Sequence, residues 1–260
     1  MRFGICAPYR DVADLGAYPF DYLEENVQRF LMPERSQEEF EKAWQEARQL
    51  PVAIEAANSL LPADLYVVET ATRKVDTRRL EGYIKTALQR AEQAGMHILV
   101  FGSGGARACP AGYSKDDAER QIGEHLAQWS GWAGEYGVEI VLEPLRYEET
   151  NTLNTVTEAG KLVESIEQSG ARLLADAYHM AYNHEDPADI VPWAALLTHV
   201  HVAEKQERAA PGRYGEDFRP LFSVLHQIGY DQRVSIECNW QNLVGEVGLA
   251  IATLREQWGE

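Results

Sequence analysis

The sequence predicts an α/β protein that folds as a closed (β/α)₈ (TIM) barrel. Short β-rich runs alternate with longer amphipathic helical patterns along the whole chain, and eight such alternations occur within 260 residues. That length is close to the usual size of one barrel of this kind. Several of the β-rich runs are almost continuously apolar, as expected for parallel strands that are covered on both faces. A doubly wound open sheet is the structural alternative.

Eight short β-rich segments are the predicted strands. No interdomain linker, sequence repeat or low-complexity tract interrupts them, so we expect a single barrel domain over residues 1–260. The segments are Phe3–Ala7, Tyr22–Val27, Val52–Ala57, His97–Gly102, Glu139–Leu145, Arg172–Asp176, His199–Ala203 and Arg233–Cys238.

Capping patterns indicate where several of the intervening helices begin and end. A Ser or Thr followed three residues later by Glu is typical of a capping box, and Asp before Pro is typical of an N-cap followed by the first helical position. A glycine after an apolar helical stripe predicts a helix end. The predicted starts are Ser36-Gln-Glu-Glu39, Ser114, Thr155-Val-Thr-Glu158 and Asp186-Pro187, and the predicted end is Gly229.

Charge and cysteine content exclude several classes of protein. The 24 Lys and Arg residues against 41 Asp and Glu give a formal net charge of −17, which argues against broad binding to nucleic acid or to anionic membranes. Three cysteines lie far apart without a CxxC pair, which argues against a disulfide framework or a thiolate zinc site and favours a reducing compartment. The N-terminus lacks the apolar run of a signal peptide, and nowhere do eighteen apolar residues follow one another. We therefore expect a cytoplasmic protein without a membrane span.

Acidic residues and histidines fall at the ends of the last four predicted strands. Neighbouring strands lie about 4.8 Å apart, so four consecutive strand ends in a curved wall can direct four side chains to one centre. Taken singly, each acid is also typical of a salt-bridge partner or a helix cap. Together, three carboxylates and one imidazole indicate a site for one divalent cation, Mn²⁺ or Mg²⁺, with Co²⁺ or Zn²⁺ as further options. The predicted ligands are Glu143, Asp176, His201 and Glu237.

Two histidines on the predicted seventh strand are candidates for the ligand position. His199 and His201 share one face, because side chains in a strand alternate with period two, so periodicity does not choose between them. His201 lies nearer the C-terminal end of the strand, where barrel enzymes carry their active sites, and is the predicted ligand. His199 is the predicted buried, hydrogen-bonded structural histidine.

Weaker signals lie in loops at the same rim. The glycine-rich stretch 101–107 with Arg107 could bind phosphate or be a plain turn. Glu55 and Asn58 could line a pocket or make core hydrogen bonds. The longest irregular stretch, 203–217, is rich in charge, Gly and Pro, and its cations could contact substrate or face solvent. Those cations are Lys205, Arg208 and Arg213.

Five motifs resemble the sugar isomerase/epimerase superfamily of xylose-isomerase-like barrels, especially the ketose 3-epimerases. They are FGSGGAR (101–107), LEPLRYEETNTLNT (142–155), DAYH (176–179), HVHVAEKQER (199–208) and IGYDQRVSIE (228–237). The similarity runs through most of the chain and is strongest from the fourth to the eighth strand.

The resemblance implies roles for individual residues. Glu143, Asp176, His201 and Glu237 match the metal ligands of the superfamily, and Glu143 and Glu237 also match its catalytic acid/base pair. Two matches imply substrate-binding residues, Glu149 and His179, and a third, Arg208, stands one residue away from the position of the superfamily's substrate-binding arginine. Arg146-Tyr147-Glu148 replaces a common Asn-Arg-aromatic run, which leaves the particular substrate open.

The implied chemistry is a proton shift next to a carbonyl group of a small sugar or sugar-like hydroxy-ketone. A divalent metal would stabilise a cis-enediolate, and two carboxylates would remove and return the proton. Alternatives are dehydration of a keto-polyol at the same site, an abasic-site endonuclease and a non-catalytic sugar-binding module. The early strand ends carry no histidine for the multi-zinc site of such an endonuclease. We expect a small carbohydrate as the binding partner; the sequence leaves the oligomeric state open, a homo-oligomer included.

Overall fold

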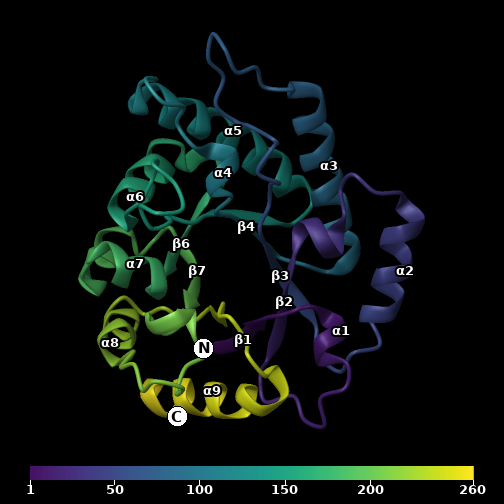
Figure 1. The fold of residues 1–260 in the computed structure, drawn as a ribbon, viewed down its shortest axis with the longest axis vertical. Helices are drawn as coiled ribbons and strands as arrows, with labels where there is room; N and C mark the ends of the chain where they lie inside the picture. Colours follow the sequence, from purple (N-terminus) through teal and green to yellow (C-terminus); the bar gives the residue numbers. More distant parts are fainter. Residues whose placement is uncertain (260) are drawn as a thin grey trace.

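Eight parallel strands close into a barrel in sequence order, with β1 paired to both β2 and β8. This computed structural model describes residues 1–259. Figure 1 shows the strands at the centre and the helices around them. The predicted fold class is confirmed, and the open doubly wound sheet is excluded. The strands are β1 Arg2–Cys6, β2 Tyr22–Asn26, β3 Ile54–Asn58, β4 Ile98–Phe101, β5 Glu139–Leu142, β6 Arg172–Asp176, β7 Leu197–Val202 and β8 Arg233–Ile236.

The helices begin at the capping residues that the sequence indicates. Ser36 and Thr155 each form a capping box with the glutamate three residues later, and the side chain of Ser114 accepts from the N–H of Asp117. Asp186 caps a 3₁₀ rather than an α-helix. The α-helices are α1 Tyr9–Val12, α2 Gln37–Ala47, α3 Thr77–Ala94, α4 Gly104–Arg107, α5 Lys115–Glu135, α6 Val156–Ser165, α7 Ala177–Asn183, α8 Arg219–Gln227 and α9 Leu243–Trp258; Val27–Leu31 is π-helical, and 3₁₀ turns cover Glu167–Ser169, Pro187–Trp193 and Gln206–Arg208. None of the helices in residues 1–259 is long and apolar enough to cross a membrane.

The inside of the barrel has an apolar and a polar half. Alternate side chains of β3 to β6 form one small apolar cluster, which contains Ala56, Ile98, Val100, Val141 and Leu174. The inward positions of β2, β7 and β8 instead carry polar side chains that are fully buried: Tyr22, Glu24, His199, His201 and Ser235. Because a buried polar group is costly without a partner, this half must be hydrogen-bonded internally.

Two strands end one residue before a predicted site glutamate. The backbone N–H of Glu143 still donates to the carbonyl of Phe101 on β4, and that of Glu237 donates to the carbonyl of Val202 on β7. Pro144 has no N–H to donate, which ends β5 earlier than the predicted Leu145. Both glutamates are therefore held by the sheet although they lie outside it.

The connection after β7 is ordered around one buried carboxylate. Glu204 is fully buried and accepts hydrogen bonds from the N–H groups of Gly212, Tyr214, Gly215 and Glu216. The prediction that 203–217 is the longest irregular stretch is wrong, because residues 59–76, between β3 and α3, form a longer one. These hydrogen bonds order the loop after β7, which contains residues at the barrel mouth.

Candidate metal centre and surrounding cavity

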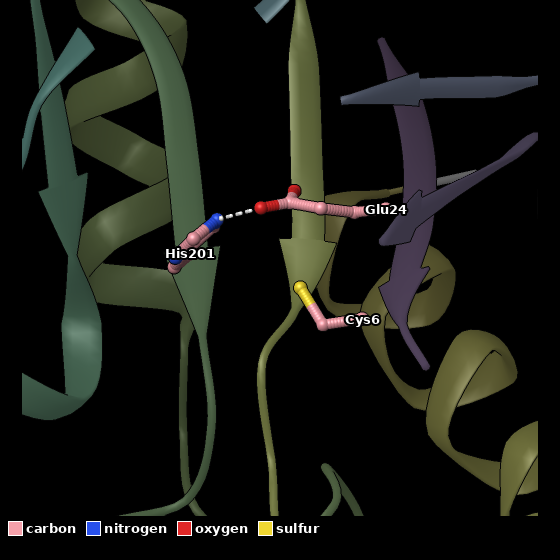
Figure 2. A group of neighbouring side chains, drawn as sticks. All are labelled: Cys6, Glu24 and His201. Atoms are coloured by element: carbon pink, nitrogen blue, oxygen red, sulfur yellow. Dashed lines mark hydrogen bonds and ion pairs between the residues drawn. The ribbon is translucent and has the colours of Figure 1, made fainter. Parts of the chain in front are cut away.

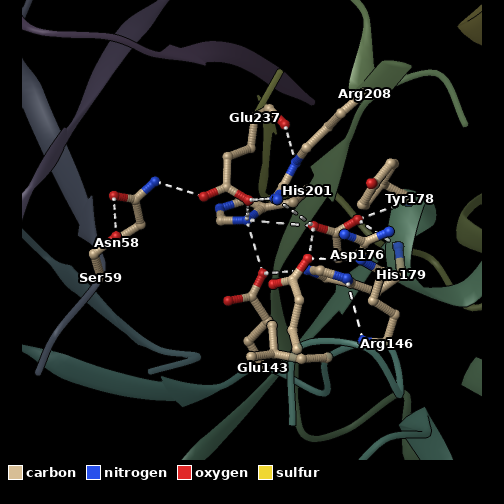
Figure 3. Close-up of polar contacts among 12 residues, drawn as sticks. Asn58, Ser59, Glu143, Arg146, Asp176, Tyr178, His179, His201, Arg208 and Glu237 are labelled. Carbon is tan, nitrogen blue, oxygen red and sulfur yellow. Dashed lines mark hydrogen bonds and ion pairs between the residues drawn. The ribbon is translucent and has the colours of Figure 1, made fainter. Parts of the chain in front are cut away.

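The four predicted ligands meet at the C-terminal mouth of the barrel. Glu143, Asp176, His201 and Glu237 each offer one ligand atom, and these atoms all lie within 4.8 Å of one another. Nδ1 of His201 lies 3.3 Å from Oε1 of Glu143 and 3.3 Å from Oε2 of Glu237. Figure 3 shows the four side chains pointing toward one another.

One carboxylate oxygen in this group has no hydrogen-bond partner. Oδ1 of Asp176 caps α7 by accepting from the N–H groups of Tyr178 and His179, at 2.7 Å and 3.2 Å. Its second oxygen, Oδ2, is buried and accepts no hydrogen bond, although nitrogen atoms of basic side chains lie 3.7 to 3.9 Å away. A buried carboxylate oxygen without a hydrogen bond is costly, and a divalent cation would satisfy it. The donor set of three carboxylates and one imidazole therefore fits such a cation.

The two glutamates at this centre have pKa values that shift in opposite directions. Burial and the nearby negative charge of Glu237 raise the pKa of Glu143. Burial also disfavours the charged form of Glu237, but the positive charges of Arg208 and His201 outweigh it and lower the pKa of Glu237 to about 2. Environments that separate two carboxyl groups in this way are typical of an acid/base pair.

A cavity of about 380 Å³ opens above the centre. Its wall contains Glu143 and Glu237 together with the three predicted substrate-binding residues, Glu149, His179 and Arg208. Glu143 and Glu149 follow β5, His179 follows β6, Arg208 lies in the loop after β7, and Glu237 follows β8. The structure therefore brings all the predicted site residues to one mouth of the barrel.

His179 is buried and held in one orientation. Its Nδ1 accepts from the backbone N–H of Arg146 at 3.3 Å, so the neutral ring carries its proton on Nε2. Nε2 lies 3.7 Å from Oδ2 of Asp176 and 4.0 Å from Oε1 of Glu143. The ring thus presents an N–H group to the cavity beside the predicted ligands.

Arg208 reaches the cavity despite its displacement by one residue in the sequence. Its guanidinium pairs with the carboxylate of Glu237, lies 3.8 Å from Oδ2 of Asp176 and stacks over the ring of Tyr178. Glu207 and Arg208 both have positive φ, 60° and 50°, so the backbone turns sharply there. Glu149 accepts from Nε of Arg146 at 2.7 Å.

Two further residues lie beside the predicted ligands, and local sequence patterns do not assign them a role. Nδ2 of Asn58 donates to Oε1 of Glu237 at 2.7 Å, and Asn58 also lines a second cavity that shares Arg208 and Glu237 with the first. Glu24 was not singled out, although it contacts His201. An acid inside a buried strand is the signal that could have identified it. His199 is buried and hydrogen-bonded to Glu24, as predicted.

The other residues that the sequence suggested as pocket or phosphate contacts lie outside the cavity. Glu55 pairs with Arg2 and Arg233. Arg213 pairs with Glu246, and Lys205 donates to the carbonyl of Ala181. The guanidinium of Arg107 is fully buried and donates to the carbonyl of Glu143, so it does not face a ligand.

Known proteins similar to this chain include sugar epimerases. A ketose 3-epimerase from Arthrobacter globiformis is 29% identical over 130 residues, covering 49% of this chain and 45% of that protein. A 3-dehydro-D-guloside 4-epimerase from Escherichia coli is 28% identical over 172 residues, covering 63% and 65%. The matches thus span about half to two thirds of these relatives.

Solved structures superpose on this chain over nearly their whole length. A D-allulose 3-epimerase from a Methylomonas species, in complex with D-allulose, superposes with a TM-score of 0.80 at 18% identity over 99% of this chain and 97% of that one. The family described as "Xylose isomerase-like TIM barrel" matches residues 9–257. The chain therefore belongs to the xylose isomerase-like TIM barrel family.

Proposed function

We propose that this protein is a divalent-metal-dependent isomerase or epimerase of a small sugar or sugar-like hydroxy-ketone. The observation that carries the proposal is that Oδ2 of Asp176 accepts no hydrogen bond although it lies buried among Glu143, His201 and Glu237, two of which line the cavity. The names of the similar proteins, which are ketose and keto-sugar epimerases, support the substrate class.

Glu143, Asp176, His201 and Glu237 would hold the cation. Their hard oxygen donors and single imidazole suit Mn²⁺ or Mg²⁺, and Co²⁺ or Zn²⁺ also accept such a set. When bound, the cation supplies electrostatic stabilisation of the negative charge that develops on substrate oxygens during proton removal.

Glu237 and Glu143 would transfer the proton. In the metal-free chain the pKa of Glu237 is lowered and that of Glu143 is raised, which favours Glu237 as the base. As a ligand of the cation, Glu143 would also be ionised, and it would take from solvent the proton that it returns. Glu237 would remove the proton from the carbon next to the carbonyl group, and Glu143 would return one. Return to the opposite face inverts the carbon, and return to the neighbouring carbon gives an aldose–ketose shift.

Three further residues would bind and orient the substrate. The N–H at Nε2 of His179 can donate to a substrate oxygen, and the carboxylate of Glu149 can accept from a hydroxyl group. Arg208 would donate from its guanidinium while holding Glu237 ionised. These donors and acceptors line one cavity and suit the hydroxyl and carbonyl oxygens of a small sugar or hydroxy-ketone.

The test is conversion of C3 to C6 ketoses and aldoses, free and phosphorylated, by protein loaded with Mn²⁺ and by chelated protein. We expect at least one sugar to be epimerised or isomerised, as followed by NMR, only when metal is present. Asp176→Ala should abolish both metal content and turnover. Glu148→Gln is the matched control, because Glu148 is exposed and absent from the cavity wall. Turnover that survives complete metal removal would contradict the proposal, and release of water from the substrate would point to the dehydratase alternative.

A further inference from the structure

A fully buried carboxylate on β2 lies behind His201. Oε1 of Glu24 accepts from Nε2 of His201 at 3.0 Å, and Oε2 accepts from Nε2 of His199 at 2.8 Å and from the hydroxyl of Ser235 at 2.6 Å. Figure 2 shows the carboxylate of Glu24 meeting the ring of His201, with the thiol of Cys6 beside them. Both oxygens of Glu24 are therefore engaged inside the barrel.

The two ring nitrogens of His201 face different neighbours. Nε2 faces Glu24, whereas Nδ1 faces Glu143 and Glu237. An ionised carboxylate only accepts hydrogen bonds, so a neutral imidazole in this place must carry its proton on Nε2. The lone pair on Nδ1 is then directed at the three carboxylates, which is the form that a cation requires.

We propose that Glu24 is a positioning residue that selects this form of His201 and thereby sets the affinity of the centre for its cation. The inference rests on the proposed metal centre but assigns a role to a residue outside it. Hydrogen bonding from a ligand histidine to a carboxylate fixes the orientation of the ring and raises its basicity as a ligand.

A chain of contacts holds Glu24 itself. Ser235 gives its hydroxyl hydrogen to Glu24, so the hydroxyl of Tyr22, 2.7 Å away, donates to Oγ of Ser235. Gly4 lies opposite both Tyr22 and Ser235 in the strand register, and a Cβ atom there would overlap the Tyr22 ring. The glycine leaves room for the tyrosine, the tyrosine orients the serine, and the serine orients the carboxylate.

Cys6 offers a rival interpretation. Its thiol, Glu24 and His201 also lie within 4.8 Å of one another, as the ligands of a second cation would. Three donors already occupy the oxygens of Glu24, which favours its role as a hydrogen-bond acceptor. The same experiment separates the two roles.

The test is the dissociation constant for Mn²⁺, measured by calorimetry on the metal-free full chain. Glu24→Gln should weaken Mn²⁺ binding about 10- to 100-fold. Glu24→Asp keeps the charge but withdraws the oxygens from His201, so it should weaken binding as well. Glu25→Gln, on the same strand but facing Tyr9 and Arg29, is the matched control and should change affinity much less. Cys6→Ala should leave affinity unchanged.

Nitrogen-15 NMR of the Mg²⁺-loaded protein gives an independent readout. His201 should carry its proton on Nε2, and Tyr22→Phe should weaken this hydrogen bond without removing a charge. That variant keeps the inference testable even when Glu24→Gln does not fold. A proton on Nδ1, full affinity in folded Glu24→Gln or Glu24→Asp, or an equal loss in Cys6→Ala would overturn the positioning role. A wild-type chain that binds no Mn²⁺ would overturn the metal centre itself.

Discussion

Gly102 lies directly against the carboxylate of Glu143. A Cβ atom on this glycine, just after β4, would overlap Oε2 of Glu143. The contact explains why a glycine stands at position 102, whereas Arg107 in the same stretch is buried and donates to the carbonyl of Glu143. The stretch makes room for a site residue.

Gly102→Ala should therefore displace the Glu143 carboxylate and lower activity. A misplaced reacting group costs on the order of 10²-fold, so we expect a loss in kcat/KM of that size. Gly131→Ala is the control, because a Cβ atom at Gly131 on α5 meets nothing within 4 Å. Full activity in a folded Gly102→Ala variant would contradict a reacting role for Glu143 in its present position.

His179→Ala should impair turnover but spare the metal. The ring lies beside the ligands but contributes no atom to the group of four, so metal content should stay near one ion per chain while KM rises or kcat falls. Metal content by elemental analysis and steady-state kinetics check this. Loss of the metal in this variant would show that His179 is a ligand.

Cation binding should release protons and become tighter as pH rises. In the metal-free chain, burial disfavours the charged form of His201, but Glu24 and Glu237 outweigh it and raise its pKa; burial raises the pKa of Glu143. Both groups therefore hold protons at higher pH than usual, and a cation must displace them. Affinity for Mn²⁺ should fall as pH is lowered from about 8 to about 5.

Calorimetry in buffers of different ionisation enthalpy counts the released protons. Glu143→Gln has no proton to lose at that position and should release fewer. Affinity that does not depend on pH, or a net uptake of protons, would contradict the arrangement of charges described above.

The ligands could be predicted from the sequence because the fold alone brings them together. Consecutive parallel strands place their C-terminal ends side by side, so acids that end buried runs, such as Asp176, point to one centre. His201 was preferred to His199 by the same rule, and the structure gives each histidine the predicted surroundings.

The pairing of Glu24 and Asn58 with particular ligands could not be predicted in this way. Glu24 and Asn58 act across the barrel on His201 and Glu237, which are 177 and 179 residues away in the chain. Spacing along one strand carries no information about such partners. Arg208 lies in a loop that has positive φ angles at Glu207 and Arg208 and whose backbone N–H groups donate to the carboxylate of Glu204. Local sequence patterns reveal neither feature.

Proton exchange in D₂O tests the central claim, that Glu143 and Glu237 move a proton at a carbon next to a carbonyl group. A sugar accepted by the Mn²⁺-loaded protein should gain deuterium at that carbon, and a chelator should stop it. Glu143→Gln and Glu237→Gln, each with its metal occupancy measured, should reduce exchange by about 10² or more. Tight, metal-dependent binding of the sugar with neither exchange nor turnover would contradict the claim and leave a binding protein.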